Sequence, residues 1–143
     1  MSEILIGVDR SAHSRRAVEF AVARALERKD SVVLTHVIPW SPFSFNTASE
    51  NEHRHKQKAA ELSAATTQVI DPLAGIVREA GVPVEVIVRH GDPVDMLLEI
   101  AQDRGSDHIV LGRTGDSRVR QALFGSLPAQ MVQVAPVPVT VVP

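Results

Sequence analysis

The sequence predicts an α/β fold in which a parallel sheet is covered by helices on both faces. Five short apolar runs of strand length alternate with stretches whose apolar residues recur at helical spacing. Apolar runs of this kind are typical of strands that are buried on both sides, as in a parallel sheet. The 143 residues suffice for one domain, and the absence of cysteine excludes a disulfide framework and cysteine-ligated zinc.

The ends of the expected helices and strands are less clearly marked in the first half of the chain than in the second. In chain order we expect a strand over 4–8, a helix over 11–28, a strand over 31–38, a helix over 52–80, a strand over 82–89, a helix over 93–104, a strand over 107–111, a helix over 126–134 and a strand over 137–142. The first strand stops at Asp9, and Ser11 or Ser14 is expected to cap the first helix. Residues 39–53 hold two prolines and three aromatic residues and are expected to form a loop, which acts as a lid or as a partner-binding patch.

Helix boundaries are sharper in the second half. The second helix is expected to end before Gly81 and to be kinked or broken at Pro72. The third helix has Asp92 as its N-cap, Pro93 in its first turn and Gly105 beyond its end. Because strands and helices alternate throughout, we expect a ligand at the carboxyl ends of the strands, where the strand order reverses.

Composition and charge argue against two classes of protein, nucleic-acid-binding proteins and membrane-spanning proteins. The net charge is -2 and aromatic residues make up 3% of the chain, so there is neither a basic stripe nor a set of stacking platforms for nucleic acid. No apolar run approaches 18 residues, so no membrane span is expected. The N-terminal residues do not resemble a signal peptide, and the expected location is the cytoplasm.

The pattern with the most chemical content is Gly-x2-Gly-x9-Gly-Ser, formed by Gly112, Gly115, Gly125 and Ser126 after the fourth strand. Glycines let backbone N–H groups approach a ligand closely, and a helix that begins at Ser126 adds its own unpaired N–H groups. It is not a Walker A loop, because no lysine follows the second glycine. Three glycines alone would be ordinary turn residues, but their position after the fourth strand favours a phosphate site.

This pattern resembles the ATP-binding signature of the universal stress protein family. The resemblance extends to the stretches Ile4-Leu5-Ile6-Gly7-Val8-Asp9-Arg10-Ser11, Leu34-Thr35-His36-Val37, Asp107-His108-Ile109-Val110-Leu111-Gly112 and Ala135-Pro136-Val137-Pro138-Val139-Thr140-Val141-Val142. It therefore covers nearly the whole chain. It implies one domain over 1–143 with a Rossmann-like five-stranded parallel sheet of order 3-2-1-4-5, and a homodimer formed through residues 137–142.

The resemblance also implies roles for individual residues. Asp9 would lie near the ribose or near a magnesium ion bound to the phosphates, and the backbone of Val37 would meet the adenine. The ribose and phosphates would be held by residues after the fourth strand and at the start of the last helix: Gly112, Gly115, Gly125, Ser126 and Leu127. By itself, Asp9 has a plainer interpretation as a cap of the first helix or of its loop.

Two residues depart from the family pattern. Arg10 replaces the common glycine after Asp9, and it either crowds the site or adds a phosphate contact. Pro128 removes one N–H group from the start of the last helix, as in relatives that resemble cyclic-AMP binders, so AMP and cyclic AMP stay alternatives to ATP. Arg113, between the first two glycines, is expected to face either the ligand or the partner subunit.

The sequence thus predicts a stress-response or signalling module that binds an adenine nucleotide, ATP first, without strong catalysis. No general base is evident, so any hydrolysis of ATP is expected to be slow. The alternatives are a dimeric interaction protein with a vestigial pocket, a cyclic-AMP-binding relative, and an enzyme that adenylates a substrate. His36 and His90, at strand ends, are interpreted as structural, and His53 and His55 as solvated.

Overall fold

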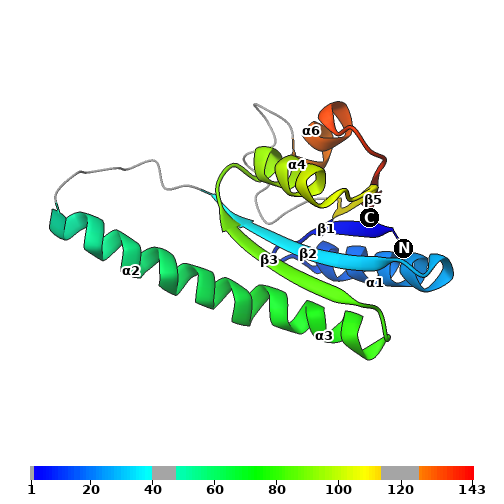
Figure 1. Cartoon of the computed structure of the whole chain (residues 1–143), viewed down its shortest axis with the longest axis horizontal. Coiled ribbons are helices and arrows are strands. Elements are labelled where there is room, and N and C mark those ends of the chain that lie inside the picture. Colours follow the sequence, from blue (N-terminus) through cyan, green and yellow to red (C-terminus); the bar gives the residue numbers. More distant parts are fainter. Residues whose placement is uncertain (1, 40–47, 114–125) are drawn as a thin grey trace.

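The central element of the fold is a five-stranded parallel sheet of order β3-β2-β1-β4-β5 (Figure 1). It is seen in a computed structural model that describes residues 2–39, 48–113 and 126–143. In chain order the elements are β1 (Glu3–Gly7), α1 (Ala12–Arg28), β2 (Ser31–Ile38), α2 (Ala48–Ala65), η1 (Thr66–Ile70), α3 (Asp71–Glu79), β3 (Val84–His90), α4 (Pro93–Arg104), β4 (His108–Gly112), α6 (Leu127–Val134) and β5 (Val139–Val142). The expected fold class and strand order are confirmed.

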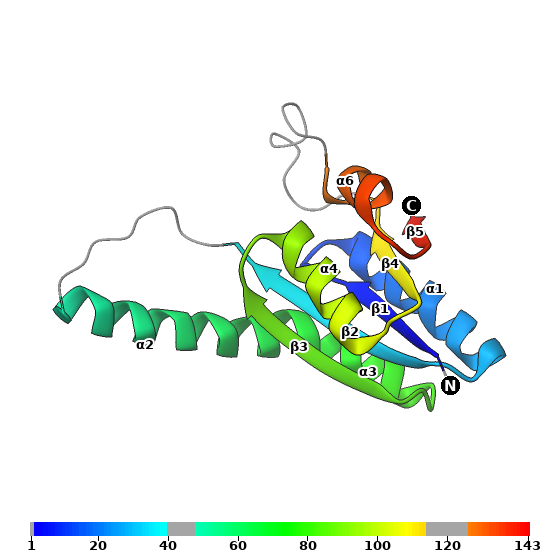
Figure 2. The ribbon, with the colours of Figure 1, turned by 45° about the horizontal axis from the view of Figure 1, so that its top comes forward.

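Helices cover the sheet on both faces (Figures 1 and 2). The chain leaves β1 for α1 on one face, where η1 and α3 also pack, and α4 and α6 lie on the other. Alternate residues of β1 separate the two cores: Ile4 and Ile6 pack under α1, whereas Leu5 packs under α4 and α6. In the described ranges no helix is long and apolar enough to cross a membrane.

The start of α1 differs in detail from the expectation. Ser11 does occupy the N-cap position, but its side chain makes no capping hydrogen bond. Ser14 is buried, and its hydroxyl accepts a hydrogen bond from the N–H of Asp9 and donates one to the Asp9 carboxylate. Neither serine hydroxyl therefore caps α1, because Ser14 stabilises the preceding loop instead.

The second helical region is longer and more continuous than expected. It begins at Ala48, so the end of the expected loop over 39–53 is helical; Trp40, Phe43 and Phe45 lie outside the described residues. The chain is not broken at Pro72, because η1 widens the helix just before it: the N–H of Asp71 bonds to the carbonyl of Thr66, five residues back. The wider turn accommodates a proline that has no N–H to donate.

The boundaries of α4 agree with the prediction. Asp92 is the N-cap and accepts a hydrogen bond of 3.0 Å from the N–H of Asp95. Pro93 opens the helix, and Gly105 ends it with φ +67°, a left-handed conformation that glycine adopts without strain. Here the local sequence alone determines where the helix starts and stops.

Candidate functional site

The strand order reverses between β1 and β4, which marks the expected ligand edge of the sheet. The chain runs from β1 to β2 on one side and returns to β4 on the other, so β1 has both as parallel neighbours. In an open α/β sheet, ligands bind outside the carboxyl ends of the strands at such a reversal. Asp9, which follows β1, and Gly112, which ends β4, both lie at this edge.

Asp9 is held in place by its own loop. Its Oδ1 atom accepts hydrogen bonds of 2.8 Å from the N–H of Ser11 and 2.9 Å from the hydroxyl of Ser14. The same hydroxyl accepts a bond of 2.7 Å from the N–H of Asp9. Asp9 thus performs the loop-capping role that was its plainer interpretation, and in the described part of the chain these hydrogen bonds use one of its two carboxylate oxygens, Oδ1.

Gly112 is where β4 meets the first turn of α1. A Cβ atom at this glycine would lie 2.7 Å from the Cβ of His13 and 2.8 Å from its carbonyl carbon and oxygen. Arg113 continues the pairing, since its N–H donates to the carbonyl of Val142 at 2.7 Å, while its side chain is exposed. The glycine is therefore required by packing, whether or not a ligand approaches it.

Ser126 caps the start of α6. Its hydroxyl accepts a hydrogen bond of 3.3 Å from the N–H of Ala129, and its carbonyl accepts one from Gln130. Of the first three residues of α6, Pro128 has no N–H and Ala129 donates its N–H to the Ser126 side chain. The N–H of Leu127 is the one that the cap leaves for another acceptor. The glycines before this helix, Gly115 and Gly125, lie outside the described residues.

Val37 and Arg10 have different surroundings in the structure. Val37 is buried at the end of β2, among residues under α4 and α6, and the neighbouring His36 Nδ1 lies 2.7 Å from the carbonyl of Val8. Arg10 extends along the α1 and α3 face, where its guanidinium donates to Oε1 of Gln68 at 2.7 Å. Its side chain therefore lies against η1 in this structure.

Among the residues that the structure describes, three buried polar atoms near this edge, which sequence reasoning missed, have no hydrogen-bond partner. They are Ser11 Oγ, His13 Nδ1 and Thr35 Oγ1. Ser11 and His13 belong to the start of α1, whereas Thr35 pairs in register with Gly7 at the end of β1. Thr35 is on the same side of β2 as Val37, so the three atoms flank the end of β1 from both faces. Unpartnered buried polar groups are rare in folded proteins and require an explanation, and a ligand is one.

Sequence comparison relates the whole chain to one family. The profile of the Universal stress protein family matches residues 1–143. Universal stress protein YxiE of Bacillus subtilis (strain 168) is 24% identical over 145 residues, which cover 99% of this chain and 98% of that protein.

Solved structures agree in fold. Universal stress protein UspA from Lactobacillus plantarum matches with a TM-score of 0.82 at 23% identity, over 99% of this chain and 97% of that chain. The universal stress protein from Archaeoglobus fulgidus in complex with dAMP matches with a TM-score of 0.62 at 25% identity, over 100% of this chain and 98% of that chain. A universal stress protein in complex with cAMP matches with a TM-score of 0.67 at 23% identity, over 99% of this chain and 96% of that chain.

Proposed function

The chain belongs to the universal stress protein family, and we propose that it is a stress-response or signalling module that binds an adenine nucleotide, namely ATP. The observation that carries the proposal is that Ser11 Oγ, His13 Nδ1 and Thr35 Oγ1, buried around the end of β1, have no hydrogen-bond partner within residues 2–39, 48–113 and 126–143. A nucleotide offers hydroxyls, ring nitrogens and phosphate oxygens, which can satisfy such donors and acceptors. The Archaeoglobus fulgidus relative in complex with dAMP supports this ligand class.

In this proposal the nucleotide lies across the carboxyl end of β1. The backbone at Val37 meets the adenine, and Asp9 meets the ribose or a magnesium ion through the carboxylate oxygen that its loop does not use. The phosphates extend toward residues that follow β4 and begin α6, which are Gly112, Arg113, Gly115, Gly125, Ser126 and Leu127. Arg10 contributes to the phosphates only if it leaves Gln68.

Magnesium would arrive with the nucleotide in this scheme. Among the described residues, no cluster of three or more histidine or acidic side chains is placed to hold a metal ion. Magnesium commonly takes one or two carboxylates, phosphate oxygens and waters, and Asp9 supplies one carboxylate.

A vestigial pocket is the second candidate function, and specific contacts favour it. Asp9 caps its loop, Gly112 packs on His13, and Ser126 caps α6, so each has a structural role without a ligand. In that case the protein acts through its surfaces as a dimeric interaction module. Measuring nucleotide affinity separates the two candidates.

The test begins with the natural ligand. Mass spectrometry of small molecules released from natively purified protein, followed by calorimetry with ATP, AMP and cyclic AMP, should identify one adenine nucleotide that binds. Gly115→Val should abolish that binding without unfolding the chain. If none of the three nucleotides binds, the proposed function is wrong and the vestigial pocket is supported.

Thr35→Val tests whether the buried hydroxyl of Thr35 contacts the nucleotide. The substitution keeps the shape of the side chain and removes a buried hydroxyl that has no hydrogen-bond partner in the described part of the chain. We expect the nucleotide-free protein to be at least as stable as the wild type, while nucleotide affinity falls. Thr66→Val is the matched control, because the Thr66 hydroxyl has a hydrogen-bond partner and donates to the carbonyl of Leu62 at 2.8 Å. Equal nucleotide affinity in Thr35→Val and the wild type would contradict the assignment.

A further inference from the structure

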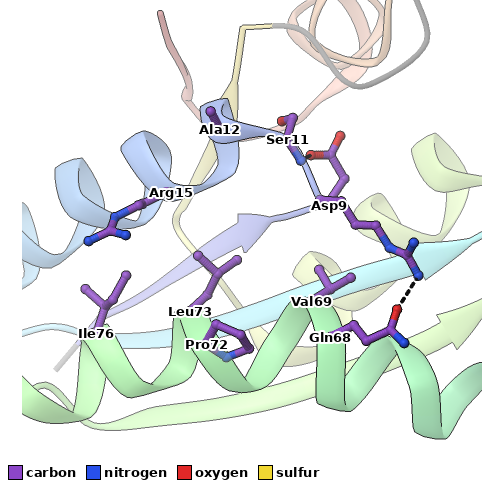
Figure 3. Close-up of a pocket in the computed structure, with 10 residues that line it drawn as sticks. Asp9, Ser11, Ala12, Arg15, Gln68, Val69, Pro72, Leu73 and Ile76 are labelled. Atoms are coloured by element: carbon purple, nitrogen blue, oxygen red, sulfur yellow. Dashed lines mark hydrogen bonds between the residues drawn. The ribbon is translucent and has the colours of Figure 1, made fainter.

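The strand β3 (Val84–His90) forms the edge of the sheet opposite β5. Within the described ranges it pairs with β2 alone, and Figure 2 shows it at the margin of the sheet. The edge is open, because Val86 is 38% exposed and the side chain of Glu85 is 68% exposed. The groove that Figure 3 shows, between the start of α1 and the helix formed by η1 and α3, includes no residue of β3, so this edge is a separate surface. An open strand edge promotes pairing with another chain.

The backbone groups of β3 that do not bond to β2 belong to its even-numbered residues. Val32 lies opposite Val84 in the parallel register, and its N–H donates to the carbonyl of Pro83 at 2.9 Å. In a parallel ladder a residue bonds to the neighbours of the residue opposite it, so residues 85, 87 and 89 direct their N–H and C=O groups toward β2. The N–H and C=O groups of residues 84, 86, 88 and 90 therefore point outward, where a further strand would pair.

The side chains of this edge are complementary to those of a second, antiparallel copy. If a two-fold axis passes through Ile87, Val86 lies opposite Val88 of the second copy, and Glu85 lies opposite its Arg89. The two valine pairs are then hydrogen-bonded pairs, which their outward N–H and C=O groups allow. The two Glu85–Arg89 pairs are non-hydrogen-bonded pairs, in which facing side chains come closer. An axis at Val86 or at Val88 would instead place an apolar Ile87 opposite Glu85 or Arg89.

The two charged residues of this edge can pair with another chain. Arg89 is exposed, and in the described part of the chain its side chain forms no salt bridge or hydrogen bond. Glu85 contacts Arg104 at 3.1 Å through Oε2, which leaves Oε1 for a second cation. Arg104 also contacts Glu3 at 2.8 Å, so it keeps an acidic partner if Glu85 turns toward another chain. Exposed ion pairs contribute modestly to affinity, so these pairs mainly select the register and the partner.

We propose that β3 pairs in antiparallel orientation with β3 of a second copy of this chain, with the two-fold axis at Ile87. The self-complementary order of Glu85 and Arg89 about that residue favours a second copy over an unrelated strand. The contact joins one strand edge to another, so it is smaller than a standard interface and forms at high protein concentration. Arg89 lies in register with Val37, which the nucleotide proposal uses, so the tests use nucleotide-free protein and do not depend on that proposal.

Disulfide trapping tests the position of the axis. The chain has no cysteine, so an introduced one is its single thiol. The two copies of residue 87 would face each other with Cα atoms about 4.5 Å apart, within reach of a disulfide. Val86→Cys is the control, because its two copies would be diagonal neighbours about 7–8 Å apart, although Val86 is the more exposed residue. Under mild oxidation Ile87→Cys should form covalent dimers at least about tenfold faster than Val86→Cys. Equal or slower cross-linking of Ile87→Cys would overturn the proposal.

Charge reversal tests the ion pairs without an introduced cysteine. Arg89→Glu places two glutamates opposite each other, and Glu85→Arg places two arginines opposite each other. In sedimentation velocity at high concentration, each variant alone should associate about tenfold more weakly than the wild type. An equimolar mixture of the two variants restores both ion pairs and should regain the wild-type association. Arg89→Lys keeps the charge and is the matched control, which should associate as the wild type does. If the mixture associates no more than its components, or Arg89→Glu associates as strongly as Arg89→Lys, the proposed pairing is wrong.

Discussion

The α-carbon of Gly112, at the end of β4, lies directly against the backbone of His13 in the first turn of α1. A Cβ atom at Gly112 would approach the His13 carbonyl carbon and oxygen to 2.8 Å, a distance that real side chains do not adopt. The contact fixes the two segments that flank the strand-order reversal relative to each other. A glycine of the nucleotide signature thus has a packing role that is independent of any ligand.

Gly112→Ala should therefore destabilise the protein even when nucleotide is absent. The atoms that the new methyl group meets belong largely to backbone, so the chain must shift, and we expect a loss of about 1–3 kcal/mol in the free energy of unfolding. Urea unfolding monitored by circular dichroism measures this loss. Gly75→Ala is the control, because nothing lies within 4 Å of a Cβ there, and it should raise helix stability by up to about 1 kcal/mol. Equal stability of Gly112→Ala and the wild type would disprove the contact.

Substitutions at Ser126 can separate helix capping from phosphate binding. Ser126→Ala removes the acceptor for the N–H of Ala129 and should lower the free energy of unfolding by about 0.5–1 kcal/mol. Ser126→Asp restores an N-cap acceptor and should recover that stability. Its negative charge repels phosphates, so calorimetry should show loss of ATP binding in this stable variant. ATP binding of wild-type strength by Ser126→Asp would mean that the phosphates do not approach α6.

His108 gives the stability of the protein a dependence on pH. Burial lowers the pKa of His108 below its ordinary value of 6.5, and the ring nitrogen Nε2 lies 2.7 Å from the Thr140 hydroxyl, which links β4 to β5. The unfolded chain thus binds a proton more readily than the folded one, and folding stability falls as pH decreases through 6.5 toward the lowered pKa. Urea unfolding at pH 7.5 and 5.5 measures this fall. His108→Gln should show a smaller fall between the two pH values; an identical fall would assign the dependence to other groups.

The sequence predicted the architecture well because the relevant signals are local. Runs of β-branched residues identified the strands, and Asp92 and Gly105 identified both ends of α4. The continuous helix through Pro72 was not predictable, because η1 is a change in hydrogen-bonding pattern that depends on packing beneath Val69 and Ile70. The start of α2 was missed because its first residues are polar and have no apolar periodicity.

The candidate site was predictable in position but only partly in detail. The edge of the sheet followed from the order of elements, whereas the unpartnered atoms of His13 and Thr35 depend on burial, which comes from residues distant in sequence. Thr35 could have been suspected as a polar residue in an otherwise apolar strand. The contact of Arg10 with Gln68 joins residues 58 positions apart, and no local pattern indicates it.

The edge strand β5 leads to a prediction about assembly. In the described part of the chain β5 pairs with β4 alone, and Val141 on this strand is 36% exposed. An apolar edge strand promotes pairing with another chain, so we expect a homodimer in which β5 meets its counterpart. Val141→Lys places a charge in that interface and should shift the mass measured by light scattering from dimer to monomer. Leu26→Lys, on the exposed side of α1, removes an apolar side chain of 54% exposure elsewhere and should stay dimeric. Both variants replace an exposed apolar side chain with lysine and differ in its position. If Val141→Lys alone is monomeric, the dimer contact lies at β5. A dimer with both variants would exclude it.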